Sequence, residues 1–327
     1  MTAIRRARNT AAPALPVEAR VAALDWERIA ADLDADGCAI VRAVLSPEEC
    51  QSLAATYGDD ARFRSRMVMA RHGFGRGEYK YFAHPLPGPV ASLRTALYPP
   101  LSGIANRWNA AMGVDVRYPD RHADFLRRCH DAGQTKPTPL LLRYGVGDHN
   151  CLHQDLYGEH VFPLQVAFLL SEPGEDFTGG EFVLTEQRPR MQSRAEVVPL
   201  RRGDGVVFPV HHRPVRGTRG VYRVNMRHGV SRVRSGRRHT LGNIFHDASL
   251  GWLNAHPAPP WPRAGEGDTN RGPLVCPTAQ ECITSRPMLA RVAPEPPGGP
   301  QPIGCPPRHL AQPPRSRRRV RSGRRRG

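Results

Sequence analysis

Lysine is almost absent from this chain of 327 residues: of its 47 lysine and arginine residues, only Lys80 and Lys136 are lysines. The positive charge is therefore carried by arginine, a composition typical of proteins encoded by GC-rich genomes. Long apolar runs are absent as well. This second absence argues against a membrane-spanning helix and against the apolar core of a signal peptide.

Regularly paired cysteines are also lacking. The 7 cysteines are an odd number and are unevenly spaced, which argues against the framework of a small disulfide-rich protein. Cys276 and Cys282 with His256 approach a zinc-ligand set, but their spacing does not match the usual pairs. The pattern indicates a reducing compartment, and we expect a cytoplasmic protein without a membrane partner.

The composition changes near residue 248. Residues 249–327 hold 16 of the 33 prolines and carry 13 arginines against 4 acidic residues, a net charge of +9, which leaves +8 of the total of +17 for residues 1–248. A segment of this composition buries too little apolar surface to offset the entropy lost on ordering. We predict one domain over 1–248 and a disordered Pro/Arg-rich tail over 249–327.

Two interpretations of this tail stay open. Arginine-rich tails bind nucleic acid without sequence preference, through contacts to phosphates. A frameshifted C-terminus in a GC-rich gene would have the same composition and no function. The positive charge of 1–248 is a separate matter, and it favours a polyanionic substrate for the domain itself.

Short apolar runs bounded by turn residues predict eight strands in the second half of the domain. They lie at 140–144, 151–155, 164–170, 181–185, 196–200, 205–210, 222–226 and 240–245. Such strands, separated by Gly, Pro and Asp turns, are typical of two packed sheets of the jelly-roll type. We predict a mainly β fold, a cupin-like double-stranded β-helix whose core spans 140–247 and whose open mouth holds a ligand.

Residues 20–135 are predicted to form mainly helical support for this core. Asp25 is placed to cap a helix, and 38–45 has the pattern of a strand. Ser46 precedes a proline and has a glutamate, Glu49, three residues later. This arrangement predicts a helix that begins with a capping box.

The segment Cys151-Leu152-His153-Gln154-Asp155 has the pattern of a metal site. In an extended strand, side chains two residues apart share a face, so His153 and Asp155 point the same way. A second imidazole from a distant strand would complete two histidines and one carboxylate, the set that leaves three positions open on ferrous iron. The sequence therefore predicts a non-haem iron site.

The third ligand is chosen from several downstream histidines. These are His211, His212, His228, His239 and His246. We rank His228 first because a Gly-containing turn and then Arg238 follow it, and a guanidinium on the next strand matches a carboxylate with two parallel hydrogen bonds. His212 is the alternative, with Arg223 or Arg227 then binding the carboxylate.

With these residues the chain resembles the 2-oxoglutarate- and Fe(II)-dependent dioxygenases, in the branch with prolyl-4-hydroxylase-like and AlkB-like members. The resemblance also includes 143–148 (Arg-Tyr-Gly-Val-Gly-Asp), 179–182 (Gly-Gly-Glu-Phe) and 203–208 (Gly-Asp-Gly-Val-Val-Phe). It implies Fe(II) held by His153, Asp155 and His228, with 2-oxoglutarate and O2 as co-substrates. It further implies that Arg238 and Tyr144 bind 2-oxoglutarate and that no residue beyond the metal ligands is catalytic.

The implied reaction hydroxylates a C–H bond with release of succinate and CO2, and the substrate stays open. One reading is oxidative dealkylation of damaged DNA, and another is hydroxylation of a peptide or a small molecule. A third is a non-catalytic cupin-like binding or sensing domain.

The Gly- and aromatic-rich segment 73–81 is either a lid over the site or an ordinary surface loop. The aromatic residues Phe162, Phe177 and Tyr157 are explained equally well as part of the core. The oligomeric state is open.

Overall fold

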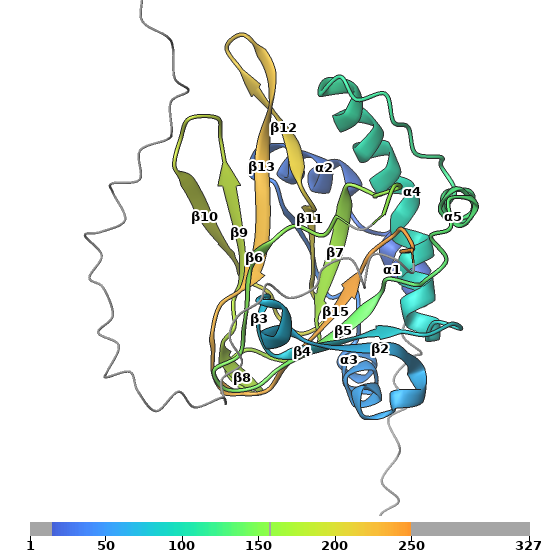
Figure 1. Cartoon of the computed structure of the whole chain (residues 1–327), viewed down its shortest axis with the longest axis vertical. Helices are drawn as coiled ribbons and strands as arrows, with labels where there is room; N and C mark the ends of the chain where they lie inside the picture. The colour runs from blue at the N-terminus through green and yellow to red at the C-terminus, as the bar shows by residue number, and fades with distance from the viewer. Residues whose placement is uncertain (1–14, 157, 250–327) are drawn as a thin grey trace, which may run out of the picture. The chain divides into compact units, whose positions relative to one another are not determined.

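The computed structural model describes residues 15–156 and 158–249. Except for Ser249, the predicted tail lies outside these residues, as do the cysteines and the histidine of the zinc-like set. Five α-helices occur in the described part, and α1, α4 and α5 lie beside one face of a β-sheet (Figure 1). The helices are α1 (Val17–Ala22), α2 (Trp26–Asp36), α3 (Pro47–Ala55), α4 (Gly88–Ala111) and α5 (His122–Asp131), with 3-10 turns at Thr56–Gly58, Asp60–Arg62 and Met69–His72.

The helix ends follow directly from the sequence. At the start of α2, the Asp25 carboxylate accepts a hydrogen bond of 3.0 Å from the Arg28 amide. At the start of α3, the Ser46 hydroxyl accepts from the Glu49 amide at 3.2 Å, and the Glu49 carboxylate accepts from the Ser46 amide at 2.8 Å. The predicted capping box is therefore confirmed. Gly37 ends α2 with a φ of 77°, which a glycine adopts without strain.

Two antiparallel sheets make up the β core. The seven-stranded sheet has the order β1-β11-β7-β15-β5-β4-β2. Its strands are β1 (Ala39–Val41), β2 (Phe63–Val68), β4 (Glu78–Phe82), β5 (Leu140–Tyr144), β7 (Leu164–Leu169), β11 (Gly205–Pro209) and β15 (Arg238–Asn243). The six-stranded sheet has the order β10-β9-β13-β6-β3, and β12 also pairs with β13. Its strands are β3 (Gly75–Arg76), β6 (His149–His153), β9 (Phe182–Gln187), β10 (Ser193–Val198), β12 (His212–Gly217) and β13 (Gly220–Val230), while β8 (Phe177–Gly179) and β14 (Val233–Gly236) form a separate pair.

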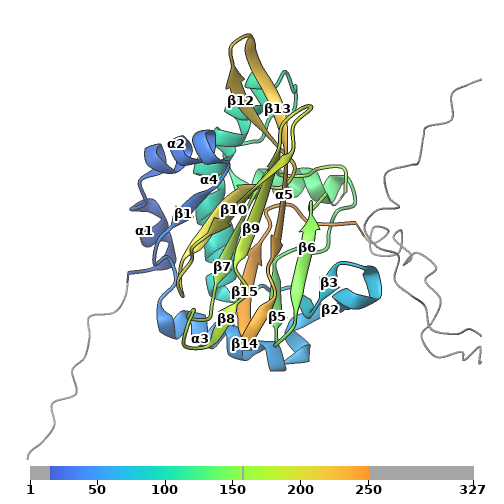
Figure 2. The same cartoon turned by 90° about the vertical axis from the view of Figure 1, so that its left-hand side faces the viewer.

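The chain alternates between the two sheets. Strands β5, β7, β11 and β15 lie side by side in the seven-stranded sheet, whereas β6, β9, β10 and β13 lie in the six-stranded one. Figure 2 shows the six-stranded sheet in front, with the hairpin of β12 and β13 extending beyond the other strands. Two four-stranded sheets visited in this order form a double-stranded β-helix, so the predicted fold is confirmed.

Two apolar cores meet at the seven-stranded sheet. On its helical face, Leu97 and Trp108 of α4 pack in one cluster with Phe168 of β7. On its other face, Ala167 of β7 packs with Leu184 of β9 in a second cluster between the two sheets. All six residues of β7 are buried, because this strand is covered on both sides. None of the described helices has the length and apolar character needed to cross a membrane.

The predicted support region contains more β structure than expected. Strands β1 to β4 all lie within 20–135, and the strand expected over 38–45 is limited to Ala39–Val41. Segment 73–81 is not a free loop, because Gly75 of β3 lies opposite Asn150 of β6. A Cβ atom at Gly75, whose φ is 125°, would lie 2.4 Å from the His149 carbonyl oxygen. Glycine thus allows this segment to approach the strand that carries His153.

Candidate active site

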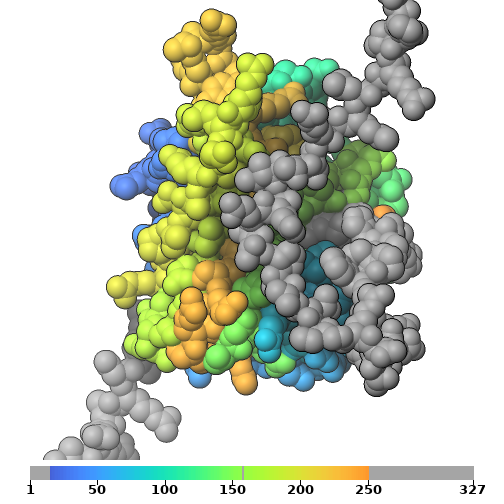
Figure 3. Space-filling model, turned by 60° about the vertical axis from the view of Figure 1, so that its left-hand side comes forward, coloured from blue at the N-terminus to red at the C-terminus, as the bar shows by residue number. Residues whose placement is uncertain are grey.

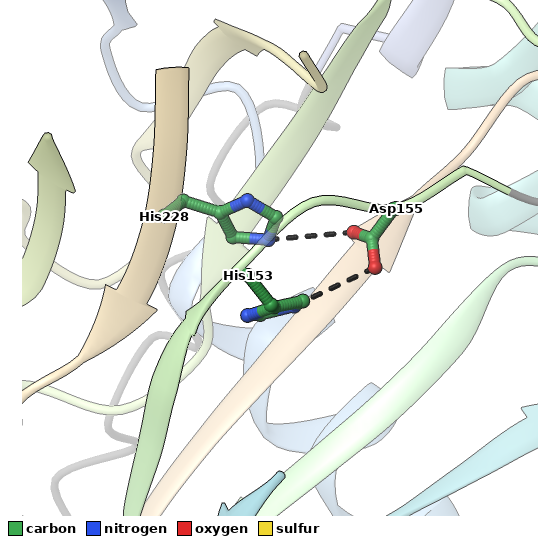
Figure 4. Close-up of side chains that lie close together, drawn as sticks. All are labelled: His153, Asp155 and His228. Atoms are coloured by element: carbon green, nitrogen blue, oxygen red, sulfur yellow. Dashed lines mark ion pairs between the residues drawn. The ribbon is translucent and has the colours of Figure 1, made fainter. Parts of the chain in front are cut away.

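The three predicted metal ligands come from two neighbouring strands of the six-stranded sheet. His153 is the last residue of β6, Asp155 follows two residues later, and His228 lies in β13. In the antiparallel register of these strands, His228 lies opposite His153. Figure 4 shows both imidazole rings directed toward the Asp155 carboxylate.

The ligand atoms of these side chains converge on one point. The His153 Nε2 atom lies 3.5 Å from Asp155 Oδ1, and the His228 Nε2 atom lies 3.3 Å from Asp155 Oδ2. One potential ligand atom from each of the three residues lies within 4.8 Å of the others. The His153 Nδ1 atom is 2.8 Å from the Cys151 carbonyl oxygen. This contact keeps the proton on Nδ1 and leaves Nε2 available to a metal.

The electrostatics of this group favour a bound cation. Burial alone would raise the pKa of Asp155, but the charge of His153 and hydrogen bonds to both histidines hold it well below its ordinary value. Burial, together with the charge of His153, lowers the pKa of His228. The site therefore offers the Asp155 carboxylate and a neutral His228 imidazole. The charge of Asp155 outweighs burial and raises the pKa of His153, so a cation that binds here displaces a proton from that imidazole.

A buried amide orients the carboxylate. The Gln165 side chain, from β7 of the opposite sheet, donates a hydrogen bond of 2.7 Å to Asp155 Oδ2. Its Nε2 atom also lies 3.5 Å from His228 Nε2. The ring of Phe208 packs against the His228 imidazole with centroids 4.6 Å apart. Both sheets thus contribute to holding the ligand group in place.

Arg238 and Tyr144 lie together in the seven-stranded sheet. Arg238 of β15 is opposite Tyr144 of β5, and its Cζ atom is 5.6 Å from the centre of the Tyr144 ring. The Arg238 side chain donates a hydrogen bond to the Thr240 hydroxyl, but Arg238 Nε and the Tyr144 hydroxyl are buried without a hydrogen-bond partner among the described residues. Burial lowers the pKa of Arg238 to about 10, so the guanidinium stays charged at neutral pH.

One cavity joins this pair to the metal-ligand group. It has a volume of about 200 Å³ and is lined by His153, Asp155, His228, Tyr144 and Arg238 together with mainly apolar side chains. Within the described part of the chain, Arg238 forms no ion pair although it is only 1% exposed. A buried charge of this kind is costly unless an anion neutralises it. The cavity is therefore suited to a small dianion whose one end faces the ligand group and whose other end faces Arg238.

The remaining predicted residues lie elsewhere. His212 is on β12 opposite Asn225, outside the ligand group, and Arg223 donates a hydrogen bond of 2.7 Å to the Met112 carbonyl oxygen. Phe162 and Phe177 are buried in the two cores, and Tyr157 is outside the described residues. The structure thus brings together the five residues ranked first, and the roles assigned to them remain proposals.

Two polar cavity residues, Gln165 and Thr240, are not predicted from the sequence, and Phe74 is predicted only as part of a segment that is either a lid or a loop. Gln165 is a single amide in an otherwise apolar strand, and such an isolated polar residue is a usable signal. Thr240 lies two residues after Arg238 on the same strand, so alternation places both on one face. Phe74 also lines the cavity, but its position depends on the pairing of β3 with β6, which no local pattern predicts.

Two comparisons by sequence identify relatives. Residues 77–248, more than half of the chain, match the Oxygenase-NA family, described as an oxygenase catalysing oxidative methylation of damaged DNA. An uncharacterized protein of Mycobacterium tuberculosis, present in strains CDC 1551 / Oshkosh and H37Rv, is 52% identical over 168 residues, which are 51% of this chain and 72% of that protein.

Solved structures that align with the chain are more distant. A prolyl-4-hydroxylase from Pseudomonas putida is 14% identical with a TM-score of 0.40, over 66% of this chain and 96% of that one. An oxidoreductase of the 2OG-Fe(II) oxygenase family from Burkholderia pseudomallei is 15% identical with a TM-score of 0.43, over 69% and 94%.

The sequence match and the site lead to the same class. The double-stranded β-helix and the His–Asp–His group agree with the predicted use of Fe(II), 2-oxoglutarate and O2. The family match confirms the prediction that the chain is an oxygenase. The chain belongs to the Oxygenase-NA family and is an oxygenase.

Proposed function

We propose that this protein is an Fe(II)- and 2-oxoglutarate-dependent oxygenase that removes alkyl groups from damaged nucleic acid, acting in the cytoplasm. His153, Asp155 and His228 would hold the iron, and Arg238 with Tyr144 would bind the far carboxylate of 2-oxoglutarate. The observation that carries the proposal is the buried guanidinium of Arg238, which lacks an ion pair among the described residues and shares a cavity with the ligand group.

Each side chain has a defined task in this reaction. The bound iron supplies the activation of O2 that C–H oxidation requires. Arg238 offers a planar pair of donors to a carboxylate, and burial raises the pKa of the Tyr144 hydroxyl, which therefore remains a hydrogen-bond donor. Phe208 packs against His228 and keeps water from one side of its ring.

The choice of an alkylated base as substrate rests on three observations. The family is described as acting on damaged DNA. The net charge of residues 1–248 is positive. Phe74 lines the cavity and offers an aromatic ring there, which is stacked on the His72 ring with centroids 5.4 Å apart and an interplanar angle of 24°. The Cys151 amide donates a hydrogen bond of 2.9 Å to the Phe74 carbonyl oxygen, and this bond holds Phe74 beside β6. A flipped base stacks on such a surface.

The oxidation has a balanced outcome. Oxygen inserted into a C–H bond of an N-methyl group gives an N-hydroxymethyl group, which releases formaldehyde and leaves the N–H form of the base. The second oxygen atom leaves in succinate as 2-oxoglutarate loses CO2. Such chemistry removes a methyl group rather than adding one.

Turnover of defined substrates tests the proposal. The full chain, supplied with Fe(II) and 2-oxoglutarate, is offered an oligonucleotide with N-methylated bases, the unmethylated oligonucleotide and a proline-containing peptide. We expect succinate and formaldehyde with the methylated oligonucleotide alone, and neither with a His153→Ala protein. Hydroxylation of the peptide without oxidation of the oligonucleotide would overturn the choice of substrate, and absence of succinate with every substrate would overturn the proposal.

A further inference from the structure

The hairpin of β12 and β13 has an unusual charge. Between Asp204 and Asp247 the chain contains no aspartate or glutamate. The arginines in this interval are Arg213, Arg216, Arg219, Arg223, Arg227, Arg232, Arg234, Arg237 and Arg238. Arg213 is buried against Glu186 and Arg238 belongs to the cavity, so neither is available to a partner at the surface.

The arginines of β13 lie on the face of the sheet that is turned away from the core. Along this strand Val224, Met226 and His228 are buried, whereas Arg223 and Arg227 are exposed. Since alternate side chains of a strand point to opposite faces, the two arginines share the outer face of the six-stranded sheet. Figure 3 shows the yellow-green and gold residues of the hairpins β9–β10 and β12–β13 forming one continuous surface on this side.

The outer-face neighbours on β9 and β10 are uncharged, and they include Val183, Ala195 and Val197 as well as polar residues. Thr185 of β9 is opposite Arg227, and Gln187 is opposite Asn225. The two glutamates of the β9–β10 hairpin belong to the other face, because Glu186 is opposite the buried Met226 and Glu196 is opposite the buried Leu184.

Three exposed arginines of the hairpin are unpaired. Among the described residues, the side chains of Arg216, Arg219 and Arg227 make no ion pair and no hydrogen bond, as is also true of the exposed Arg71 and Arg194. Arg107 and Arg127, by contrast, pair with Asp34 at 2.7 Å and with Asp124 at 2.5 Å. Guanidinium groups beside amide and hydroxyl groups suit phosphate oxygens. The face has no aromatic residue on β9, β10, β12 or β13, unlike the centre of a protein interface.

This surface adjoins the proposed site. Arg227 precedes His228, and His228 lies opposite His153 on β6. Strand β13 is therefore one strand spacing, about 4.8 Å, from the strand that carries His153. Arg219, in the turn of the hairpin, is nine residues from His228, or roughly 30 Å along an extended strand. That length corresponds to about nine base pairs of duplex.

We infer that the outer face of the β12–β13 hairpin, with Arg216, Arg219 and Arg227, binds the phosphate backbone of nucleic acid on one side of the base being oxidised. The inference takes its substrate from the proposed function. Its binding step is independent of catalysis, and unmodified DNA therefore tests it separately.

The test compares two triple variants of the full chain. One replaces the hairpin arginines, Arg216→Gln, Arg219→Gln and Arg227→Gln. The matched control removes the same charge on the helical side, Arg117→Gln, Arg121→Gln and Arg127→Gln. Binding of an unmodified 20-base-pair duplex, a length of roughly two turns, is measured over a series of salt concentrations. The arginine-rich residues 315–326 are present in all proteins, so their contribution cancels.

We expect the slope of log affinity against log salt to fall by about 2 to 3 in the hairpin variant, because each lost phosphate contact contributes about 0.9. The control variant should keep the wild-type slope. Equal slopes in the two variants would overturn the inference. Binding of polyglutamate, an anion without phosphate, is measured with the same proteins, and a loss of polyglutamate binding by the hairpin variant as large as its loss of DNA binding would also overturn it. A wild type that binds DNA in this way but oxidises no methylated oligonucleotide would instead overturn the proposed function alone.

Discussion

Gln165 controls the orientation of the carboxylate in the ligand group. Its amide donates to Asp155 Oδ2 from the opposite sheet, so replacing it by leucine of similar size removes one of the contacts that orient the carboxylate. We predict that Gln165→Leu weakens Fe(II) binding by about 10- to 100-fold, the usual effect of losing such a partner. Titration of the metal-free protein with Fe(II) under anaerobic conditions measures the change.

The control for this variant is Gln187→Leu. Gln187 is an exposed amide at the end of β9, and it lies outside the cavity. Its replacement should leave the Fe(II) affinity unchanged. An unaltered affinity in Gln165→Leu would show that the hydrogen bond does not position Asp155.

Gly229 allows the two ligand strands to approach each other. A Cβ atom at this position would lie 2.7 Å from the Asn150 carbonyl oxygen of β6, a contact that forces β13 and β6 apart. We predict that Gly229→Ala lowers Fe(II) affinity more than tenfold and destabilises the fold by about 1 to 3 kcal/mol. Metal titration and urea unfolding measure the two effects.

Gly103 provides a matched comparison. It lies within α4, and nothing is within 4 Å of a Cβ built there. Gly103→Ala should leave metal binding unchanged and stabilise the protein by up to about 1 kcal/mol, since alanine favours a helix. If both alanine variants bind Fe(II) like the wild type, the close approach at Gly229 does not shape the site.

At the scale of the elements, the start of α3 combines a capping box with an ion pair. Glu49 accepts the Ser46 amide and also two hydrogen bonds from Arg20, at 2.7 and 2.6 Å. We predict that Ser46→Ala costs about 1 kcal/mol of unfolding free energy and that Glu49→Ala costs more, because it breaks both contacts. Urea denaturation measures these values, with Ser52→Ala inside α3 as a control expected to be neutral or stabilising. A neutral Ser46→Ala would contradict the role of the cap.

Local patterns were sufficient for the elements whose causes are local. The capping box at Ser46 and the strand at 140–144 were predicted because caps and apolar runs depend only on neighbouring residues. All eight predicted strands are present, but their bounds differ: β13 extends to Gly220 and Val230 beyond the predicted 222–226, and the strand predicted at 151–155 is β6 at 149–153, so Asp155 lies beyond its end. Strands β2, β3, β4, β8, β12 and β14 are not among the predicted ones. Strands β3 and β8 are only 2 and 3 residues long, whereas in β4 the alternation of Tyr79 and Tyr81 with charged residues is a signal that the prediction did not use.

The identity of the third metal ligand could not be predicted from local sequence patterns alone. The paired strands β12 and β13 follow the Gly-Asp turn at 203–204, and they place His212 and His228 on different strands. Which histidine faces the site depends on the register of β13 with β6. Register is set by contacts between segments far apart in the sequence, so His212 and His228 could be ranked but not separated beforehand.

For the whole molecule, buried neutral histidines link stability to pH. Burial, followed by nearby arginine charges, lowers the pKa of His122 to about 4, of His239 to about 4 and of His246 to about 3. In the unfolded chain these groups titrate near 6.5. Between about pH 6.5 and 4 the unfolded state therefore binds more protons, and stability falls as the pH is lowered.

Each such histidine contributes a slope of up to about 1.4 kcal/mol per pH unit in this window. We predict that His122→Gln, which keeps a donor for the Phe245 carbonyl, reduces the dependence of unfolding free energy on pH by about this amount near pH 5. Urea unfolding from pH 7 to 4.5 measures it. The exposed His84 supplies the control, and an equal change in His84→Gln would contradict the assignment to burial.

The most direct test of the proposed site is anaerobic binding of Fe(II) and 2-oxoglutarate, followed by the visible charge-transfer absorption of the complex. The proteins are wild type, His228→Ala, His212→Ala and Arg238→Ala. Absorption in wild type and His212→Ala, and its loss or strong weakening in the other two, is the predicted result. Absorption lost in His212→Ala but kept in His228→Ala, or absent from folded wild type, would contradict the site described here.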